Sequence, residues 1–160
     1  MRKGKGREAK LSFGGHALVE NRHGLRVDLR VSEATGRSER QTAIEMLAQR
    51  ERRRRITVAA DRGYDSADFV RYCRGATITP HVTQNTHCRS AIDRRTVRHP
   101  GYAISQRVRK RIEQVFGWVK TVGGLRRSRY RGKQRTQLAA HRVGAAYNLL
   151  RMARRFAQSP

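Results

Sequence analysis

The sequence predicts a mixed α/β domain in which helices cover a sheet, and three patterns support this fold class. Residues 25–31 alternate apolar and polar side chains, which is typical of a strand with one buried face. Residues 56–60 form a short, wholly apolar run, which is typical of a strand buried on both faces. Residues 105–122 and 136–156 repeat apolar side chains at helical spacing. The predicted order of elements is ββαβαβ followed by two helices.

The first half of the chain is predicted to form a hairpin and a helix. The apolar segment 17–19 leads into a turn-rich tetrad at 21–24, and the returning strand carries apolar side chains on one face. These side chains are Leu25, Val27, Leu29 and Val31. Ser38 with Gln41 three residues later resembles a capping box, so a helix should begin there. It should end in the arginine run at 52–55, because cations suit a helix C-terminus.

A helix and a second strand are predicted to follow the apolar run at 56–60. Asp65 or Ser66 should cap this helix, whose inward side chains are Phe69, Val70 and Cys73. The strand begins at 77–79 and should lie at a sheet edge, because Pro80 cannot donate to a ladder. Residues 83–100 are polar and without a period, which predicts a loop or flap.

Two helices are predicted in the last third of the chain. The first, 105–122, should stop at Gly123 and Gly124, and a basic loop at 126–133 follows it. The second should occupy 136–156. Its predicted inward side chains are Leu138, Val143, Ala146, Leu149, Leu150 and Ala153.

The composition points to a nucleic-acid partner. The 160 residues suit one domain, and 37 Lys and Arg against 12 Asp and Glu give a formal net charge of +25. An anionic membrane surface is the weaker alternative, because the cations are spread over several elements instead of one amphipathic helix. No apolar run approaches the roughly 18 residues of a spanning helix, and no apolar region follows the basic N-terminus as in a signal peptide. Cys73 and Cys88 make no disulfide framework, which favours a reducing cytoplasm.

Two carboxylates in this basic chain are candidates for chemistry. Asp61 directly follows the apolar run at 56–60, and Glu113 is the only acidic residue after Asp93. Arg109 precedes Glu113 by one helical turn, Lys120 follows it by two, and the three share one edge of the apolar stripe. Carboxylates amid cations suggest metal-assisted chemistry on a phosphodiester. The simpler alternatives are that Asp61 only caps a turn and that Glu113 only pairs with Arg109.

Other side chains are candidates for DNA contact, zinc binding or core packing. The loop residues Arg126, Arg127, Arg129 and Tyr130 are candidate DNA contacts, the alternative being solvated charge. His87, Cys88 and His99 lack a fourth partner at zinc spacing, so a zinc site is not expected. Phe116, Trp118 and Cys73 are expected to pack in the core.

Several segments resemble insertion-sequence DDE transposases of the IS-five/IS-four type, in the C-terminal part of the catalytic domain. These segments are 2–6 (RKGKG), 15–18 (GHAL), 20–25 (ENRHGL), 60–65 (ADRGYD), 105–107 (SQR) and 111–120 (RIEQVFGWVK). The resemblance implies a ribonuclease-H-like mixed sheet with covering helices. It also implies an active site of two Asp and one Glu that holds Mg²⁺ or Mn²⁺.

The resemblance assigns Asp61 as the second acid of that site and Glu113 as the third. The family signature is a Tyr, two residues, an Arg, three residues, the Glu, six residues and a Lys. Arg109, Glu113 and Lys120 fit this spacing, whereas Gln106 stands at the Tyr position. An amide can still contact a phosphate, so Gln106 is a candidate phosphate-binding residue.

The resemblance also implies that the first Asp lies on a central first strand, upstream of 2–6. We therefore expect residues 1–10 to be a basic arm and residues 11–160 to be a partial catalytic domain, a truncated and inactive remnant. Asp28 is a poor substitute, because it alternates with Arg26 and Arg30 on the predicted solvent face.

The implied partners are DNA, as insertion-sequence ends and target, and another copy or a separate N-terminal transposase fragment. The implied location is the bacterial cytoplasm, with the nucleoid. The main alternative is a non-catalytic basic DNA-binding protein that regulates a full-length transposase. An RNA-binding or ribosome-associated protein would share the charge without needing the matching segments.

Overall fold

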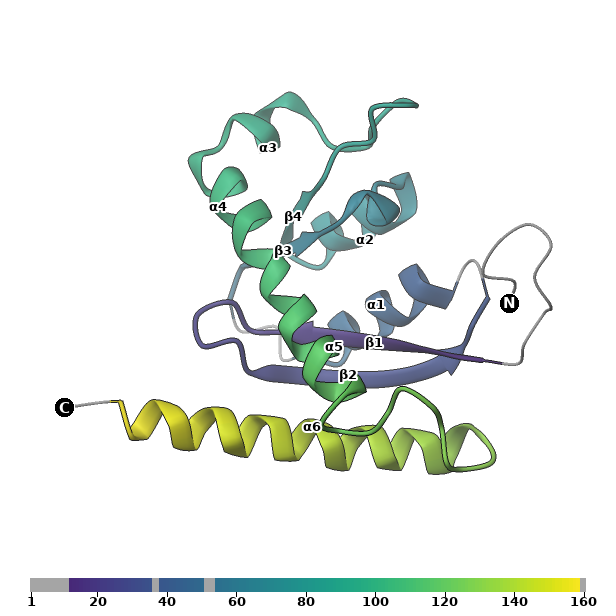
Figure 1. Cartoon of the computed structure of the whole chain (residues 1–160). Helices are drawn as coiled ribbons and strands as arrows, with labels where there is room; N and C mark the ends of the chain where they lie inside the picture. Colours follow the sequence, from purple (N-terminus) through teal and green to yellow (C-terminus); the bar gives the residue numbers. More distant parts are fainter. Residues whose placement is uncertain (1–11, 36–37, 51–53, 159–160) are drawn as a thin grey trace. The chain divides into compact units, whose positions relative to one another are not determined.

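The computed structural model describes residues 12–35, 38–50 and 54–158, and these form two compact units (Figure 1). Unit 1 comprises Met1–Ala43 and Arg111–Pro160, and unit 2 comprises Ile44–Lys110. Helix α1, Ser38–Ala48, runs across the boundary between them. Each unit contains a two-stranded sheet and helices, so the predicted mixed α/β class is confirmed. The arm predicted at 1–10 lies outside the described residues.

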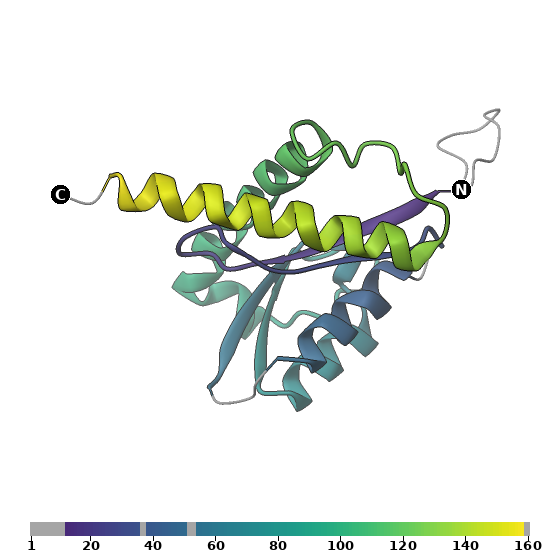
Figure 2. The same ribbon diagram turned by 90° about the horizontal axis from the view of Figure 1, so that it is seen from below.

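Unit 1 is a hairpin covered by helices. β1, Phe13–Val19, pairs antiparallel with β2, Arg26–Glu33. Helices α5, Ile112–Lys120, and α6, Lys133–Phe156, contribute to the same core, and Figure 2 shows α6 lying along the hairpin. The buried core side chains are Leu29, Val31, Val115, Val119, Ala140 and Tyr147. The predicted hairpin and both C-terminal helices are therefore present.

A β-bulge changes the predicted face of β2. Leu18 is opposite Asp28, but Val19 is opposite Arg26, so Val27 has no partner across the ladder. The side chain of Val27 is consequently 57% exposed, and its predicted inward position is wrong. Arg26 turns toward α6 instead. A Cβ on Gly144 would lie 2.5 Å from Arg26 Nε, so any larger residue there would require the Arg26 side chain to move.

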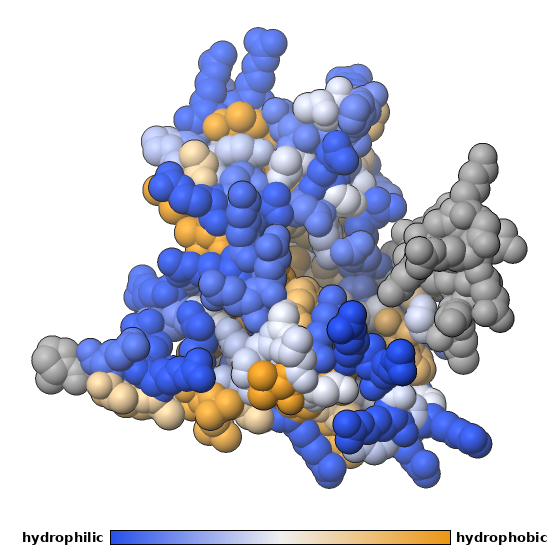
Figure 3. Space-filling view, in the orientation of Figure 1, coloured by the Kyte–Doolittle hydropathy of each residue, from blue (hydrophilic) through white to orange (hydrophobic). Residues whose placement is uncertain are grey.

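The predicted inward face of α6 is also wrong in most positions. Its buried residues are Thr136, Ala140, Gly144 and Tyr147, which recur at three to four residues. Leu138, Leu149 and Leu150 are about half exposed or more, and Figure 3 shows hydrophobic surface along this helix. Ala146 and Ala153 are exposed as well, and only Val143 of the predicted set is partly buried.

Unit 2 is built on a strand–helix–strand segment. β3, Ile56–Ala60, pairs in parallel with β4, Ile78–Val82, with Ala60 opposite Val82. Between them lie the 3₁₀ turn η1, Arg62–Tyr64, and helix α2, Ala67–Gly75, which packs on β4. The buried side chains include Phe69, Val70, Cys73, Ile78, Val82 and Ile92. Burial raises the pKa of the Cys73 thiol to about 11, as suits the predicted core residue.

Two expectations for unit 2 need correction. β3 is a strand as predicted, but none of its residues is buried and Thr57 is exposed, because β4 is its only partner in the described part of the chain. The segment 83–100 is not all loop. It contains α3, Arg94–Arg98, whose N-terminus is capped by the carboxylate of Asp93, and the start of α4, Pro100–Val108. The predicted helix at 105–122 thus begins earlier, and the 3₁₀ turn η2, Arg109–Arg111, interrupts it.

None of the helices in the described ranges is long and apolar enough to cross a membrane.

Candidate active site at the ends of two parallel strands

Asp61 directly follows β3, at the edge where parallel strands end together. Its side chain is exposed, and its Oδ1 accepts a hydrogen bond from the Gly63 N–H at 2.8 Å. This bond caps η1 and fixes the orientation of the carboxylate. Asp61 can therefore cap this turn and also bind a cation, because its Oδ2 makes no hydrogen bond to any residue that the structure describes.

A chain of hydrogen bonds connects this edge to Arg109. Thr83 follows β4, and its N–H donates to the carbonyl of Ala60 at 3.1 Å. The Thr83 hydroxyl donates to Oε1 of Gln106 at 2.6 Å. The same Oε1 accepts from Arg109 Nε at 2.8 Å. The guanidinium of Arg109 is thereby anchored to the C-terminal ends of β3 and β4, the two strands whose ends lie beside Asp61.

Gln106 is occupied by these internal bonds. Besides its two acceptor bonds, its Nε2 donates to the carbonyl of His81 at 2.6 Å. Gln106 is half-buried on the side of α4 that faces the end of β4. The arrangement favours a positioning role for Gln106, and its direct contact with a phosphate stays a prediction.

Tyr102 shares the strand-facing side of α4 with Gln106, one turn earlier. Its hydroxyl donates to the carbonyl of Val82 at 2.9 Å. Tyr102 and Thr83 were not predicted from the sequence as residues of the site. A signal for Thr83 was present, because polar residues follow both predicted strands, Asp61 after one and Thr83 shortly after the other.

Glu113 and Lys120 belong to unit 1. Glu113 lies in the first turn of α5, is exposed, and has no hydrogen bond or ion pair with any described residue. The alternative that Glu113 only pairs with Arg109 stays a prediction, because the two residues belong to different units. Lys120 Nζ lies 5.7 Å from the centre of the Phe116 ring, within reach of a cation–π interaction. The convergence of Asp61 and Glu113 on one cation stays a prediction.

The basic loop after α5 is exposed as expected. Arg126, Arg127 and Arg129 are all exposed, and Tyr130 is 48% exposed. The Ser128 hydroxyl orders the loop: it donates to the carbonyl of Tyr130 at 2.9 Å and lies 3.0 Å from Thr136 Oγ1. Tyr130 also lines a small cavity of about 110 Å³ on α6. Contact of these residues with DNA stays a prediction.

The donor chemistry of the candidate residues fits a hard divalent cation. Mg²⁺ prefers carboxylate oxygens and keeps several waters, so few protein ligands are needed. Asp61 and Glu113 supply such oxygens. Within the described ranges, however, no group of three or more His, Cys, Asp or Glu side chains is close enough to hold a metal.

The family model of the transposase DDE domain matches residues 2–149. The match covers nearly the whole chain, so the chain belongs to this family. Its members are enzymes of DNA transposition that bind DNA and generally use divalent metal ions. No curated protein and no solved structure matches the chain.

Proposed function

We propose that the chain supplies catalytic residues for DNA nicking and strand transfer at insertion-sequence ends, in a transposase of the IS-five/IS-four type with a ribonuclease-H-like fold. The proposal is supported by the hydrogen bonds that connect Arg109, through Gln106 and Thr83, to the end of β3. Asp61 directly follows that strand. A carboxylate and an anchored guanidinium at one strand edge suit a phosphodiester in contact with a cation.

Each candidate residue has a distinct role in this proposal. Asp61 and Glu113 hold Mg²⁺ or Mn²⁺ through carboxylate oxygens. The bound cation stabilises charge on the attacking and leaving oxygens. Arg109 binds phosphate oxygens with its planar guanidinium, and Lys120 acts on a neighbouring phosphate as a point charge. The basic loop with Arg126, Arg127, Arg129 and Tyr130 contacts the flanking DNA.

The family resemblance requires a third carboxylate. Asp28 is a poor candidate, because its Oδ2 is paired with Arg30 Nε at 2.8 Å and its Oδ1 accepts the Leu29 N–H. We propose that the third carboxylate comes from outside these 160 residues, either from a preceding segment or from a separate fragment. The chain alone is then inactive, and its partners are DNA and that segment or a further copy.

The test is a cleavage assay, in buffer with Mg²⁺ or Mn²⁺, on DNA that carries the insertion-sequence ends. We expect no nicking by the chain alone and nicking once an upstream segment bearing an acidic strand is added. Asp61→Asn and Glu113→Gln should each abolish that nicking while DNA binding persists. Nicking by the complemented protein that survives Glu113→Gln would refute the assignment. Nicking by the unsupplemented chain would refute the requirement for a third acid from elsewhere.

The second candidate is a non-catalytic DNA-binding regulator of a full-length transposase. The net charge of +25 is the observation that favours it. Neutralising phosphates releases counterions, so affinity should fall with salt at a slope of roughly −0.9 per phosphate contact. Tight, salt-dependent binding that is unaffected by Asp61→Asn, with no nicking after any complementation, would support this alternative.

A further inference from the structure

Helix α6 has a second face, opposite the one that packs on the hairpin, and most of its side chains are apolar. They follow one another at alternating spacings of four and three residues, which is the heptad pattern of a coiled coil. Leu138, Leu149 and Phe156 are each about half exposed or more, and hydrophobic surface along α6 is visible in Figure 3. Together these positions form a narrow stripe, the α6 seam, made of Leu138, Arg142, Ala145, Leu149, Met152 and Phe156. A period of about 3.5 residues is typical of a face that packs against another helix.

A small cavity of about 110 Å³ lies at the first turns of the seam. Arg135, Leu138, Ala139 and Arg142 line it, and Tyr130 of the preceding loop adds a wall. The four helix residues stand at i, i+3, i+4 and i+7. This is the arrangement of the hole that receives one side chain of the facing helix in a coiled coil. The cavity is smaller than the pockets that hold drug-sized ligands, and its size suits one such side chain.

The charge of α6 determines what kind of helix can lie against the seam. α6 carries six Lys and Arg and no Asp or Glu. Arg142 lies on the seam itself and Arg135 at its start, and both are exposed. Two copies of α6 side by side would bring these cations close together, and like charges across an interface are unfavourable. A helix with Glu or Asp beside its apolar positions would instead place carboxylates near them.

A lipid surface suits the seam less well than a helix does. An amphipathic helix in a membrane interface buries a broad apolar face, whereas the α6 seam is narrow and includes Arg142. Three alanines follow one side of the seam, Ala139, Ala146 and Ala153. Small side chains beside a seam let two helix axes approach closely. The pattern therefore favours a helix as the occupant.

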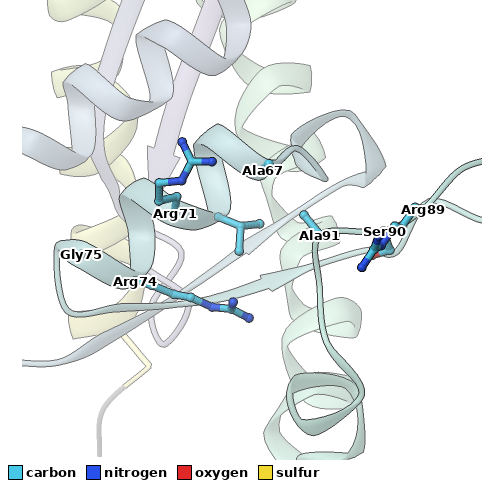
Figure 4. A pocket seen from close by; sticks show the side chains of 8 residues that line it. Ala67, Arg71, Arg74, Gly75, Arg89, Ser90 and Ala91 are labelled. Atoms are coloured by element: carbon cyan, nitrogen blue, oxygen red, sulfur yellow. The ribbon is translucent and has the colours of Figure 1, made fainter.

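The larger cavity of unit 2 offers no comparable match to a partner. Its volume is about 630 Å³, and it lies between α2 and the segment 89–91. Figure 4 shows Arg71 projecting from the side of α2 that is turned away from this segment. Arg74 is bound to Asp93 at 2.9 Å. The arginines of this cavity therefore do not converge on one ligand.

We propose that the α6 seam binds an acidic amphipathic helix of a partner protein. Apolar side chains of that helix pack on Leu138, Leu149 and Phe156, and one of them fills the small cavity. Carboxylates beside those apolar positions pair with Arg135 and Arg142. The surface lies within unit 1 and involves neither of the proposed metal ligands, so the proposal does not depend on cleavage activity.

The test is a fluorescence titration of the full chain with a synthetic acidic peptide. The peptide has about three heptads, with Leu at the a and d positions and Glu at the flanking e and g positions. A scrambled peptide of the same composition is the control for general charge attraction. We expect the heptad peptide to bind at least about tenfold more tightly, because only this peptide can bury its leucines on the seam. Equal affinities would overturn the proposal, since charge alone would then explain the binding.

A matched pair of variants locates the binding on the seam. Leu149 is 63% exposed, and Leu149→Gln should weaken binding of the heptad peptide roughly tenfold, because an apolar contact is lost. Leu150→Gln is the control, since Leu150 is adjacent and 47% exposed but lies about 100° away around the helix. It should change the affinity by less than about twofold. Leu and Gln have similar helix propensities, so the unfolding temperatures of both variants should match that of the unchanged chain. Equal losses in the two variants, or no loss with Leu149→Gln, would overturn the proposal.

Two further measurements distinguish a partner helix from other occupants of the seam. Sedimentation should show the same oligomeric state for the unchanged chain and for Leu149→Gln, and vesicles of phosphatidylglycerol should bind both equally. Self-association that Leu149→Gln abolishes would assign the seam to a second copy of the chain. Vesicle binding that the variant abolishes would assign it to a membrane surface. Either result would overturn the proposal.

Discussion

Arg109 donates its Nε–H to Oε1 of Gln106 at 2.8 Å, and the same amide group is bonded to Thr83 and to His81. Gln106 is therefore the junction between the helix that carries Arg109 and the strand ends beside Asp61. Gln106 thus holds the side chain of Arg109, which follows it by three residues. This relationship leads to the first prediction.

Gln106→Leu should destabilise the chain and weaken its binding to DNA. The substitution leaves the Thr83 hydroxyl, the His81 carbonyl and Arg109 Nε without their partner, at a cost of about 1–3 kcal/mol in the free energy of unfolding. Urea unfolding measures that cost, and a fluorescence titration with duplex DNA measures the affinity. Gln114→Leu is the control, because Gln114 is exposed on α5 and should change stability by less than about 0.5 kcal/mol. Equal stability of the two variants would contradict the positioning role.

Asp65→Asn should loosen the loop that its carboxylate closes. An amide can accept through only one oxygen, so either Asn85 or Ala91 loses a charge-assisted bond, which costs about 1–3 kcal/mol. Hydrogen exchange at these two amides should accelerate roughly tenfold or more. Asp68→Asn serves as the control, because the side chain of Asp68 is 90% exposed and only weakly paired. Unchanged exchange at Asn85 and Ala91 would show that Asp65 does not hold the loop.

His81 should make the chain less stable in mild acid. Its side chain is 4% exposed, lies 2.8 Å from the Ser105 hydroxyl, and packs against His99 and Tyr102. Burial lowers the pKa of His81 below its usual 6.5, and the charge of His99 lowers it further, whereas a hydrogen bond with the backbone of Gly101 opposes both. The unfolded chain then binds the proton at higher pH than the folded one. The free energy of unfolding should therefore fall as the pH drops from about 6.5 toward the folded pKa.

The measurement is urea unfolding between pH 7.5 and 5.5. His81→Gln should flatten the pH dependence, by at most about 1.4 kcal/mol per pH unit, because the variant has no group to protonate there. The lowered pKa of Asp93, caused mainly by its bond from the Thr96 N–H, acts below its usual 3.8 and so lies outside this window. A slope that survives His81→Gln would assign the effect elsewhere.

The local signals in the sequence predicted the elements well. The turn tetrad with Gly24, the Ser66 cap and the apolar run at 56–60 each produced the expected hairpin, helix or strand. These signals act between neighbours along the chain, where sequence alone is sufficient. The family's ribonuclease-H-like arrangement of those elements stays a prediction.

Burial was predicted less well, because it depends on partners distant in sequence. α6 carries apolar residues on two faces, and the face that packs is the one with small residues, where Gly144 admits the side chain of Arg26. The larger Leu138 and Leu149 stay exposed. The bulge at Val27 could not be predicted either, because the sequence around Val27 alternates apolar and polar residues as a regular strand does.

The same limit applies to the candidate site. Asp61 could be predicted from its place after an apolar strand. The link from Thr83 through Gln106 to Arg109 could not, because it requires knowing that β3 and β4 are parallel with Ala60 opposite Val82 and that α4 crosses their ends. Thr83 and Gln106, whose side chains form one of these hydrogen bonds, are also 23 residues apart in the sequence. Such contacts follow from the assembled fold.

Two glycines of the α5 region should respond oppositely to alanine. A Cβ on Gly123 would meet Val143 Cγ1 and lie 2.7 Å from the carbonyl oxygen of Val119, so backbone must shift where α5 approaches α6. Gly123→Ala should therefore lower the free energy of unfolding by about 1–3 kcal/mol. Gly117, in the middle of α5, has no atom within 4 Å of its added Cβ, so Gly117→Ala should raise it by roughly 0.5–1 kcal/mol. Thermal and urea unfolding measure both, and a tolerated Gly123→Ala would mean that α5 and α6 do not pack this closely.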